Sequence, residues 1–188
     1  MAEATELYDR AIGTFSRGVD AVRDDQWGGP TPCSEWTVRD LVNHMTNEQL
    51  WVVPLMAGKT IAEVGDAFDG DVLGADPKQS WKSAADAAAA AFGEPGAMDR
   101  TVHLSYGDES AANYFDQILM DTLVHGWDIC RATGADERLD PEVVDHVYAF
   151  ARPQAALFSG SGLFAPEVPV DDQADQQTRL LAMLGREA

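Results

Sequence analysis

Residues 120–128 read Met-Asp-Thr-Leu-Val-His-Gly-Trp-Asp, and they lie within a long run of helical periodicity. A residue advances by about 100° around an α-helix, so steps of four and seven return to nearly the same direction. Asp121, His125 and Asp128 therefore share one stripe of this helix. Because Ile118 and Ile129 flank the stripe, we expect it to face the protein interior.

Ionisable side chains on a buried stripe need partners, because burying them unpaired is costly in free energy. A bound divalent cation would supply such a partner. A local ion pair would do the same, because residues four apart on a helix are neighbours. The spacing of Asp121 and His125 alone leaves both interpretations open.

A second inward-facing histidine comes from another predicted helix. Thr37 followed by Asp40 resembles a capping box, and the helix that starts there runs to about residue 53, where a proline follows. His44 shares the apolar face of this helix with Met45, and Glu48 follows His44 by one turn. We therefore expect His44 to face the interior as well.

His44, Asp121 and His125 together form a candidate metal site. Two imidazoles and one carboxylate leave a coordination position open, which is typical of a catalytic zinc site. The same ligands suit iron(II), and nickel and manganese also stay open. Asp128, one turn further along the helix, would orient a metal ligand by a hydrogen bond without binding the ion itself. Glu48 would serve as a fourth ligand or as a base. Glu48 and Asp128 are thus the candidate catalytic residues.

Periodicity along the rest of the chain predicts an all-α protein. Helical patterns cover residues 3–25, 79–92, 110–133 and 140–158, with a last short helix at 171–184. Residues 57–78 read as a loop with one helical turn, residues 100–107 as a short extended segment without a second strand, and residues 159–162 as a linker. This pattern predicts a four-helix bundle, with a C-terminal helical appendage, that spans residues 1–188 as a single domain.

The charge of the chain excludes several classes of partner. The formal net charge is −19, with 32 acidic residues against 13 Lys and Arg. Nucleic acids and anionic membrane surfaces are bound by clustered basic residues, so we expect neither as a partner. No apolar run approaches the length of a membrane span, and the N-terminus lacks the features of a secretory signal. We therefore expect a cytoplasmic location.

Two cysteines, Cys33 and Cys130, are too few for a disulfide framework. Cys33 precedes a predicted helix, where a thiolate is favoured, but a packing role is the commoner one and is what we expect. Cys130 lies on a different face of its helix from Asp128. Trp36 and Trp127 are expected to be core or interface aromatics.

Two long motifs resemble a known family. Residues 31–44, Thr-Pro-Cys-Ser-Glu-Trp-Thr-Val-Arg-Asp-Leu-Val-Asn-His, are similar to the opening motif of the mycothiol-dependent maleylpyruvate isomerase N-terminal domain family, within the DinB-like metalloenzyme superfamily. Residues 121–134, Asp-Thr-Leu-Val-His-Gly-Trp-Asp-Ile-Cys-Arg-Ala-Thr-Gly, resemble its second motif. Residues 179–186, Arg-Leu-Leu-Ala-Met-Leu-Gly-Arg, resemble the end of an uncharacterised actinobacterial metal-binding subgroup.

The resemblance implies a DinB-like four-helix bundle and a divalent metal, usually zinc, at His44, Asp121 and His125. Isomerase members carry Glu where this chain has Asp121. Because Asp is one methylene shorter, the ion must lie closer to that helix or bind more weakly.

The resemblance also implies a low-molecular-weight thiol of the mycothiol type and a small-molecule electrophile. We therefore expect a thiol S-transferase or an isomerase. The alternative is a non-enzymatic metal-binding or regulatory interaction module on the same bundle. A homodimer is compatible with the sequence, and the oligomeric state is left open.

Overall fold

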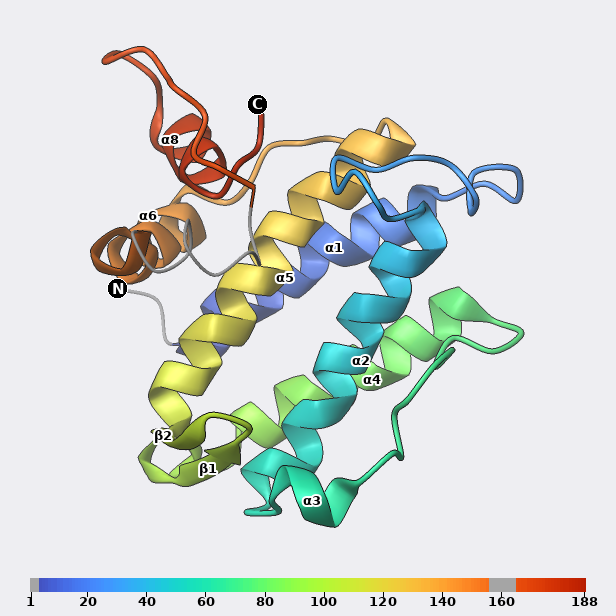
Figure 1. Cartoon of the computed structure of the whole chain (residues 1–188), viewed down its shortest axis with the longest axis vertical. Helices are drawn as coiled ribbons and strands as arrows, with labels where there is room; N and C mark the ends of the chain where they lie inside the picture. Colours follow the sequence, from blue (N-terminus) through green and yellow to red (C-terminus); the bar gives the residue numbers. More distant parts are fainter. Residues whose placement is uncertain (1–3, 156–164) are drawn as a thin grey trace.

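Four long helices pack around a shared interior in the computed structural model, which describes residues 4–155 and 165–188 (Figure 1). Helix α1 (Ala4–Ala21) packs along α5 (Ala111–Thr133), and α2 (Val38–Met56) packs along α4 (Pro77–Phe92). Contacts of α2 with α5 and of α1 with α4 close the bundle. The predicted all-α bundle is confirmed.

Shorter elements lie around this bundle. They are α3 (Ile61–Val64), η1 (Ala97–Asp99), α6 (Pro141–Ala151), η2 (Arg152–Gln154) and α8 (Gln176–Met183). Helix α6 packs against α5 and α8, so the C-terminal segment returns to the bundle as the expected appendage (Figure 1). In the part of the chain that the structure describes, no helix is both long and apolar enough to cross a membrane.

The extended segment pairs with a second strand, so the expectation of no second strand was wrong. Strand β1 (Thr101–Leu104) runs antiparallel to β2 (Gly107–Ser110), and α5 begins directly after β2. The residues of β2 are Gly, Asp, Glu and Ser, which are weak or neutral strand formers, so propensity gave no signal. A tight turn at Ser105 and Tyr106 brings the two strands together instead.

Several predicted helix ends differ from the structure. Helix α1 ends at Ala21 and not at residue 25, and α8 begins at Gln176 and not at residue 171. Helix α2 continues past Pro54 to Met56, because a proline in the last turn removes only one backbone donor while Leu55 and Met56 are buried. Helix α6 ends at Ala151 and passes into the η2 turn that contains Pro153. The predicted end near residue 158 and the linker 159–162 lie outside the described residues.

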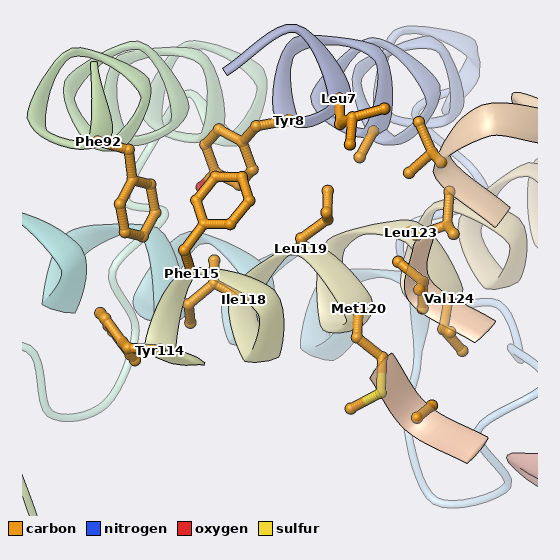
Figure 2. Close-up of a cluster of buried hydrophobic side chains, with 14 of the residues drawn as sticks. Leu7, Tyr8, Phe92, Tyr114, Phe115, Ile118, Leu119, Met120, Leu123 and Val124 are labelled. Carbon is orange, nitrogen blue, oxygen red and sulfur yellow. The ribbon is translucent and has the colours of Figure 1, made fainter. Parts of the chain in front are cut away.

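An aromatic cluster holds three helices together at one end of the bundle (Figure 2). The Phe92 ring of α4 meets Tyr8 of α1 edge-on at 5.2 Å between centroids, and it meets Phe115 of α5 at 5.1 Å. Such pairs contribute about 0.5–1.5 kcal/mol each beyond the burial of their area. Leu119 and Leu123 extend the cluster along α5 and are fully buried.

Small residues bring α1 close to α5. A Cβ atom added at Gly18 would lie 2.4 Å from Cγ2 of Ile129, and one added at Gly126 would lie 3.2 Å from Cγ2 of Thr14. Gly126 directly follows His125 in the chain. The close approach of α1 therefore fixes the rotation of α5 and, with it, the direction of the His125 side chain.

Candidate metal centre

Helices α2 and α5 bring the three predicted ligands together. His44 Nε2 lies 3.1 Å from Asp121 Oδ2, and His125 Nε2 lies 3.4 Å from Asp121 Oδ1. The donor atoms of the three residues all lie within 4.8 Å of one another. Asp121 thus lies between two imidazoles, one from its own helix and one from α2.

These separations fit a small divalent cation. An ion about 2.0–2.1 Å from each of two tetrahedral ligands holds the two donor atoms about 3.3–3.4 Å apart. The observed 3.1 Å and 3.4 Å, which are measured to the two different oxygens of Asp121, are close to that spacing. The rings of His44 and His125 cross at 80°, so they do not stack on each other. The donor set and its spacing therefore fit the cation that the motifs imply.

Asp128 holds the other side of the His125 ring. His125 Nδ1 lies 2.8 Å from Asp128 Oδ2, and the Asp128 side chain is fully buried. Because an ionised carboxylate only accepts hydrogen bonds, Nδ1 carries the proton. In the neutral imidazole, Nε2 then has the lone pair that a cation requires. A carboxylate behind a metal-bound histidine commonly orients it in this way.

Asp121 and Asp128 both favour the ionised form. Burial raises the pKa of Asp121, but the neighbouring imidazoles of His125 and His44 outweigh burial and leave that pKa below its ordinary value. Burial also raises the pKa of Asp128, and the hydrogen bond from His125 together with the charge of Arg186 reverses that effect. Both carboxylates are therefore charged at neutral pH.

Glu48 lies one helical turn beyond His44 and lines a groove that passes over the three candidate ligands. Burial, followed by the negative charge of Asp121, raises the pKa of Glu48, and His44 opposes this rise. No described residue donates a hydrogen bond to the Glu48 carboxylate. The group can therefore accept a proton from a molecule that enters the groove.

Cys33 belongs to the site, which the sequence analysis missed by expecting a packing role. Its Sγ lies 3.3 Å from Asp128 Oδ2 and 3.9 Å from His125 Nδ1. Burial and the charge of Asp128 raise the pKa of Cys33 to about 12 against the opposing charge of Arg186, so the thiol stays protonated. Cys33, His125 and Asp128 form a second possible ligand group, but its atoms already bind one another. The group around Asp121 is the better candidate.

Two further side chains of the site escaped the sequence analysis. Arg186, near the C-terminus, binds Asp128 Oδ2 through Nη2 at 2.8 Å, with 9% of its side chain exposed. The Trp36 ring lies 4.7 Å from the His44 ring, so it is part of the site wall. Both residues occur within the quoted motifs, at the end of 179–186 and inside 31–44. Helical periodicity could not indicate the position of either side chain, because both residues lie outside the helices.

A groove of about 1090 Å³ passes over the three candidate ligands. Its walls come from the loop before α2, from α2 and α5, from the β1–β2 hairpin and from the C-terminal segment. His44 and Asp121 keep 29% and 22% of their side chains exposed, whereas His125 keeps 7%. A small molecule in the groove can therefore reach the centre from the side of His44 and Asp121.

Comparison with known proteins gives one family. A sequence model of the mycothiol maleylpyruvate isomerase N-terminal domain matches residues 8–130, a range that includes all three candidate ligands. Two proteins of Mycobacterium tuberculosis, from different strains and both described as uncharacterized, are 37% identical over 183 residues, which covers 95% of this chain and 95% of each of them. No solved structure matches the chain. The chain therefore belongs to the mycothiol maleylpyruvate isomerase N-terminal domain family.

Proposed function

We propose that this protein is a divalent-metal-dependent enzyme that joins a low-molecular-weight thiol of the mycothiol type to a small electrophile, as an S-transferase or isomerase. His44, Asp121 and His125 would hold the ion. Zinc is the usual choice for this donor set, and nickel and iron also accept it. The observation that carries the proposal is the set of two imidazoles and one carboxylate beside an open groove.

The chain's own residues have separate tasks in this proposal. A bound cation supplies one chemical effect, which is to lower the pKa of a thiol at the open position until the thiol ionises. Asp128 holds the proton on Nδ1 of His125, and Arg186 balances the charge of Asp128. Glu48 takes the proton of the entering thiol, since its raised pKa suits a base that works near neutral pH.

The alternative is a non-enzymatic metal-binding or regulatory module. A module of that kind requires a covered metal site and a contiguous apolar patch elsewhere on the surface. In the described residues, the large exposed hydrophobic side chains are Val53, Tyr106 and Val170, which lie on three different segments. The groove beside the ligands is instead of the size that binds small molecules. These two observations favour the enzyme.

Metal content tests the first half of the proposal. After incubation with zinc and dialysis, we expect elemental analysis to find about one ion per wild-type chain and far less in a His44→Ala, His125→Ala variant. A His103→Ala, His146→Ala variant is the matched control, because these histidines pair with Asp108 and Asp116 at 2.6 Å and 2.7 Å away from the site. Equally low zinc in the wild type and the site variant would refute the metal centre.

Thiol binding and turnover test the second half. In cobalt-loaded protein, addition of mycothiol should produce a thiolate-to-cobalt charge-transfer band, and with 1-chloro-2,4-dinitrobenzene the free thiol should be consumed. Glu48→Gln should keep its metal and its band while turnover falls by about 10²–10⁴-fold. Metal binding without a thiol band would support the regulatory module instead. Loss of metal in Glu48→Gln would make Glu48 a ligand and not a base.

A further inference from the structure

Most of the charged side chains that line the groove are acidic. Its lining includes four carboxylates, from Glu35, Glu48, Glu109 and Asp121. Arg186 is the one Lys or Arg among the described lining residues, and Asp128 binds it through both carboxylate oxygens at 2.8 Å and 3.3 Å. Residues 156–164, which the structure does not describe, contain no charged side chain. The groove is therefore an acidic environment in which the one arginine already has an anionic partner.

A divalent cation at the centre would leave the outer groove acidic. Asp121 would bind the ion directly, and Glu48 lies one turn from the ligand His44. Glu35, in the loop before α2, and Glu109, on β2, would keep their charges at other parts of the lining. The net charge of −19 on the whole chain adds to the same field.

Apolar side chains form much of the remaining wall. Trp51 of α2 and Tyr114 of α5 line the groove, together with Phe150 of α6. Tyr106, in the hairpin turn, is 66% exposed, and its hydroxyl donates a hydrogen bond of 2.9 Å to Gln117 of α5. That bond holds the Tyr106 ring beside the groove. An aromatic or aliphatic ligand would find stacking surfaces on several sides.

We propose that the groove selects an apolar electrophile without negative charge and rejects dicarboxylates and other anions. The inference rests on the proposed function only in assigning the groove to the electrophile. Burial of an anion beside fixed carboxylates is unfavourable, and the lining offers no unpaired guanidinium or ammonium group among its described residues. The reaction class that fits is S-conjugation of an uncharged compound, and isomerisation of a dicarboxylic acid does not fit.

Two dyes with the same aromatic frame test this selection. N-phenyl-1-naphthylamine is uncharged, and 8-anilinonaphthalene-1-sulfonate carries one sulfonate on the same frame. We expect fluorescence titration of the full chain, metal-free and zinc-loaded, to give a dissociation constant about tenfold or more lower for the uncharged dye. Equal affinity, or tighter binding of the sulfonate, would overturn the proposal.

Variants locate the binding and the charge effect. Glu35→Gln with Glu109→Gln should strengthen sulfonate binding several-fold and leave the uncharged dye unchanged. Glu6→Gln with Asp24→Asn removes the same charge from exposed positions outside the groove and should change neither affinity. Tyr106→Ser alters an exposed ring, so the fold should survive, and it should weaken the uncharged dye. The proposal would be contradicted if Tyr106→Ser bound the uncharged dye as tightly as wild type does. It would also be contradicted if the affinity difference between the two dyes stayed the same in the Glu35→Gln, Glu109→Gln variant.

Zinc content measured on the same samples separates the two hypotheses. Selection of the uncharged dye by a chain that binds no zinc would leave the groove inference standing and refute the metal enzyme. Zinc binding without dye selection would refute the groove inference alone.

Discussion

Asp128 connects more of the site than any of the three candidate ligands does. It accepts hydrogen bonds from His125, Cys33 and Arg186 and is fully buried. A buried carboxylate of this kind is tolerated because its charge is matched by a buried guanidinium. The same atoms thus stabilise the fold and orient a candidate ligand.

The pairing of Asp128 with Arg186 can be tested by substitution. Asp128→Asn should destabilise the metal-free chain by about 3 kcal/mol, because Arg186 is left buried without an anionic partner. The same change should lower zinc affinity by about 10–100-fold. Urea denaturation and zinc titration measure the two effects. Adding Arg186→Gln to Asp128→Asn should restore part of the stability, and further loss in the double variant would contradict the ion-pair explanation.

Two glycines of α1 offer a matched pair of substitutions. Gly18→Ala should cost about 1–3 kcal/mol, because its Cβ would lie 2.4 Å from Ile129 and force α1 away from α5. Gly13→Ala meets nothing within 4 Å and should stabilise the chain by about 0.5–1 kcal/mol through helix propensity. Urea denaturation of both variants compares them directly. Equal effects would mean that the α1–α5 contact is looser than the structure has it.

The start of helix α2 fixes the position of His44. Thr37 Oγ1 accepts a hydrogen bond from the backbone N–H of Asp40, and Asp40 Oδ2 accepts one from the backbone N–H of Thr37 at 2.9 Å. This reciprocal cap holds the first turn of the helix that carries His44 and Glu48. The motif was predictable from the sequence because both of its partners lie within four residues.

We expect the contribution of Asp40 to the stability of the cap to depend on pH. Hydrogen bonds from Thr37 lower the pKa of Asp40, so its contribution is fully present above the ordinary Asp pKa and is lost as pH falls through the lowered one. Asp40→Asn should lower the free energy of unfolding by about 0.5–1 kcal/mol at neutral pH, with the lower value expected for this exposed group. The difference between wild type and variant in Tm should shrink below about pH 4. A difference that is constant from pH 7 to about pH 3 would argue against the cap.

How far the sequence could predict each element depended on the range of the interactions that form it. The stripe of Asp121, His125 and Asp128 follows from the helical repeat alone, and His44 follows from its own amphipathic face. Strand β2 was missed because its pairing comes from a turn and not from strand propensity. Arg186 reaches Asp128 from 58 residues away, a contact that no local pattern contains.

The C-terminal segment is part of both the hydrophobic core and the candidate site. Leu180, Leu181 and Leu184 are fully buried, and Arg186 closes the back of the candidate centre. Helix α8 reaches this position by packing on α6, which in turn packs on α5. The segment therefore couples the stability of the appendage to the geometry at His125.

Removal of this segment tests the coupling. A chain that ends at Asp175 should lose several kcal/mol of stability, because each buried Leu lost from a core costs about 2–5 kcal/mol. It should also bind zinc more weakly than the Arg186→Gln variant does. Deletion of the exposed Glu187 and Ala188 alone is the matched control and should change neither property. Thermal denaturation and zinc titration give both readouts, and an unaffected truncated chain would disprove the coupling.

The position of Arg186 also sets an order of events during protein synthesis. A ribosome releases the chain from its N-terminus, so His44, Asp121 and His125 emerge before the arginine that neutralises Asp128. Until that arginine leaves the exit tunnel, Asp128 lacks the guanidinium that matches its charge in the folded chain. Completion of the candidate centre therefore waits for Arg186, which is the last of its residues to leave the ribosome.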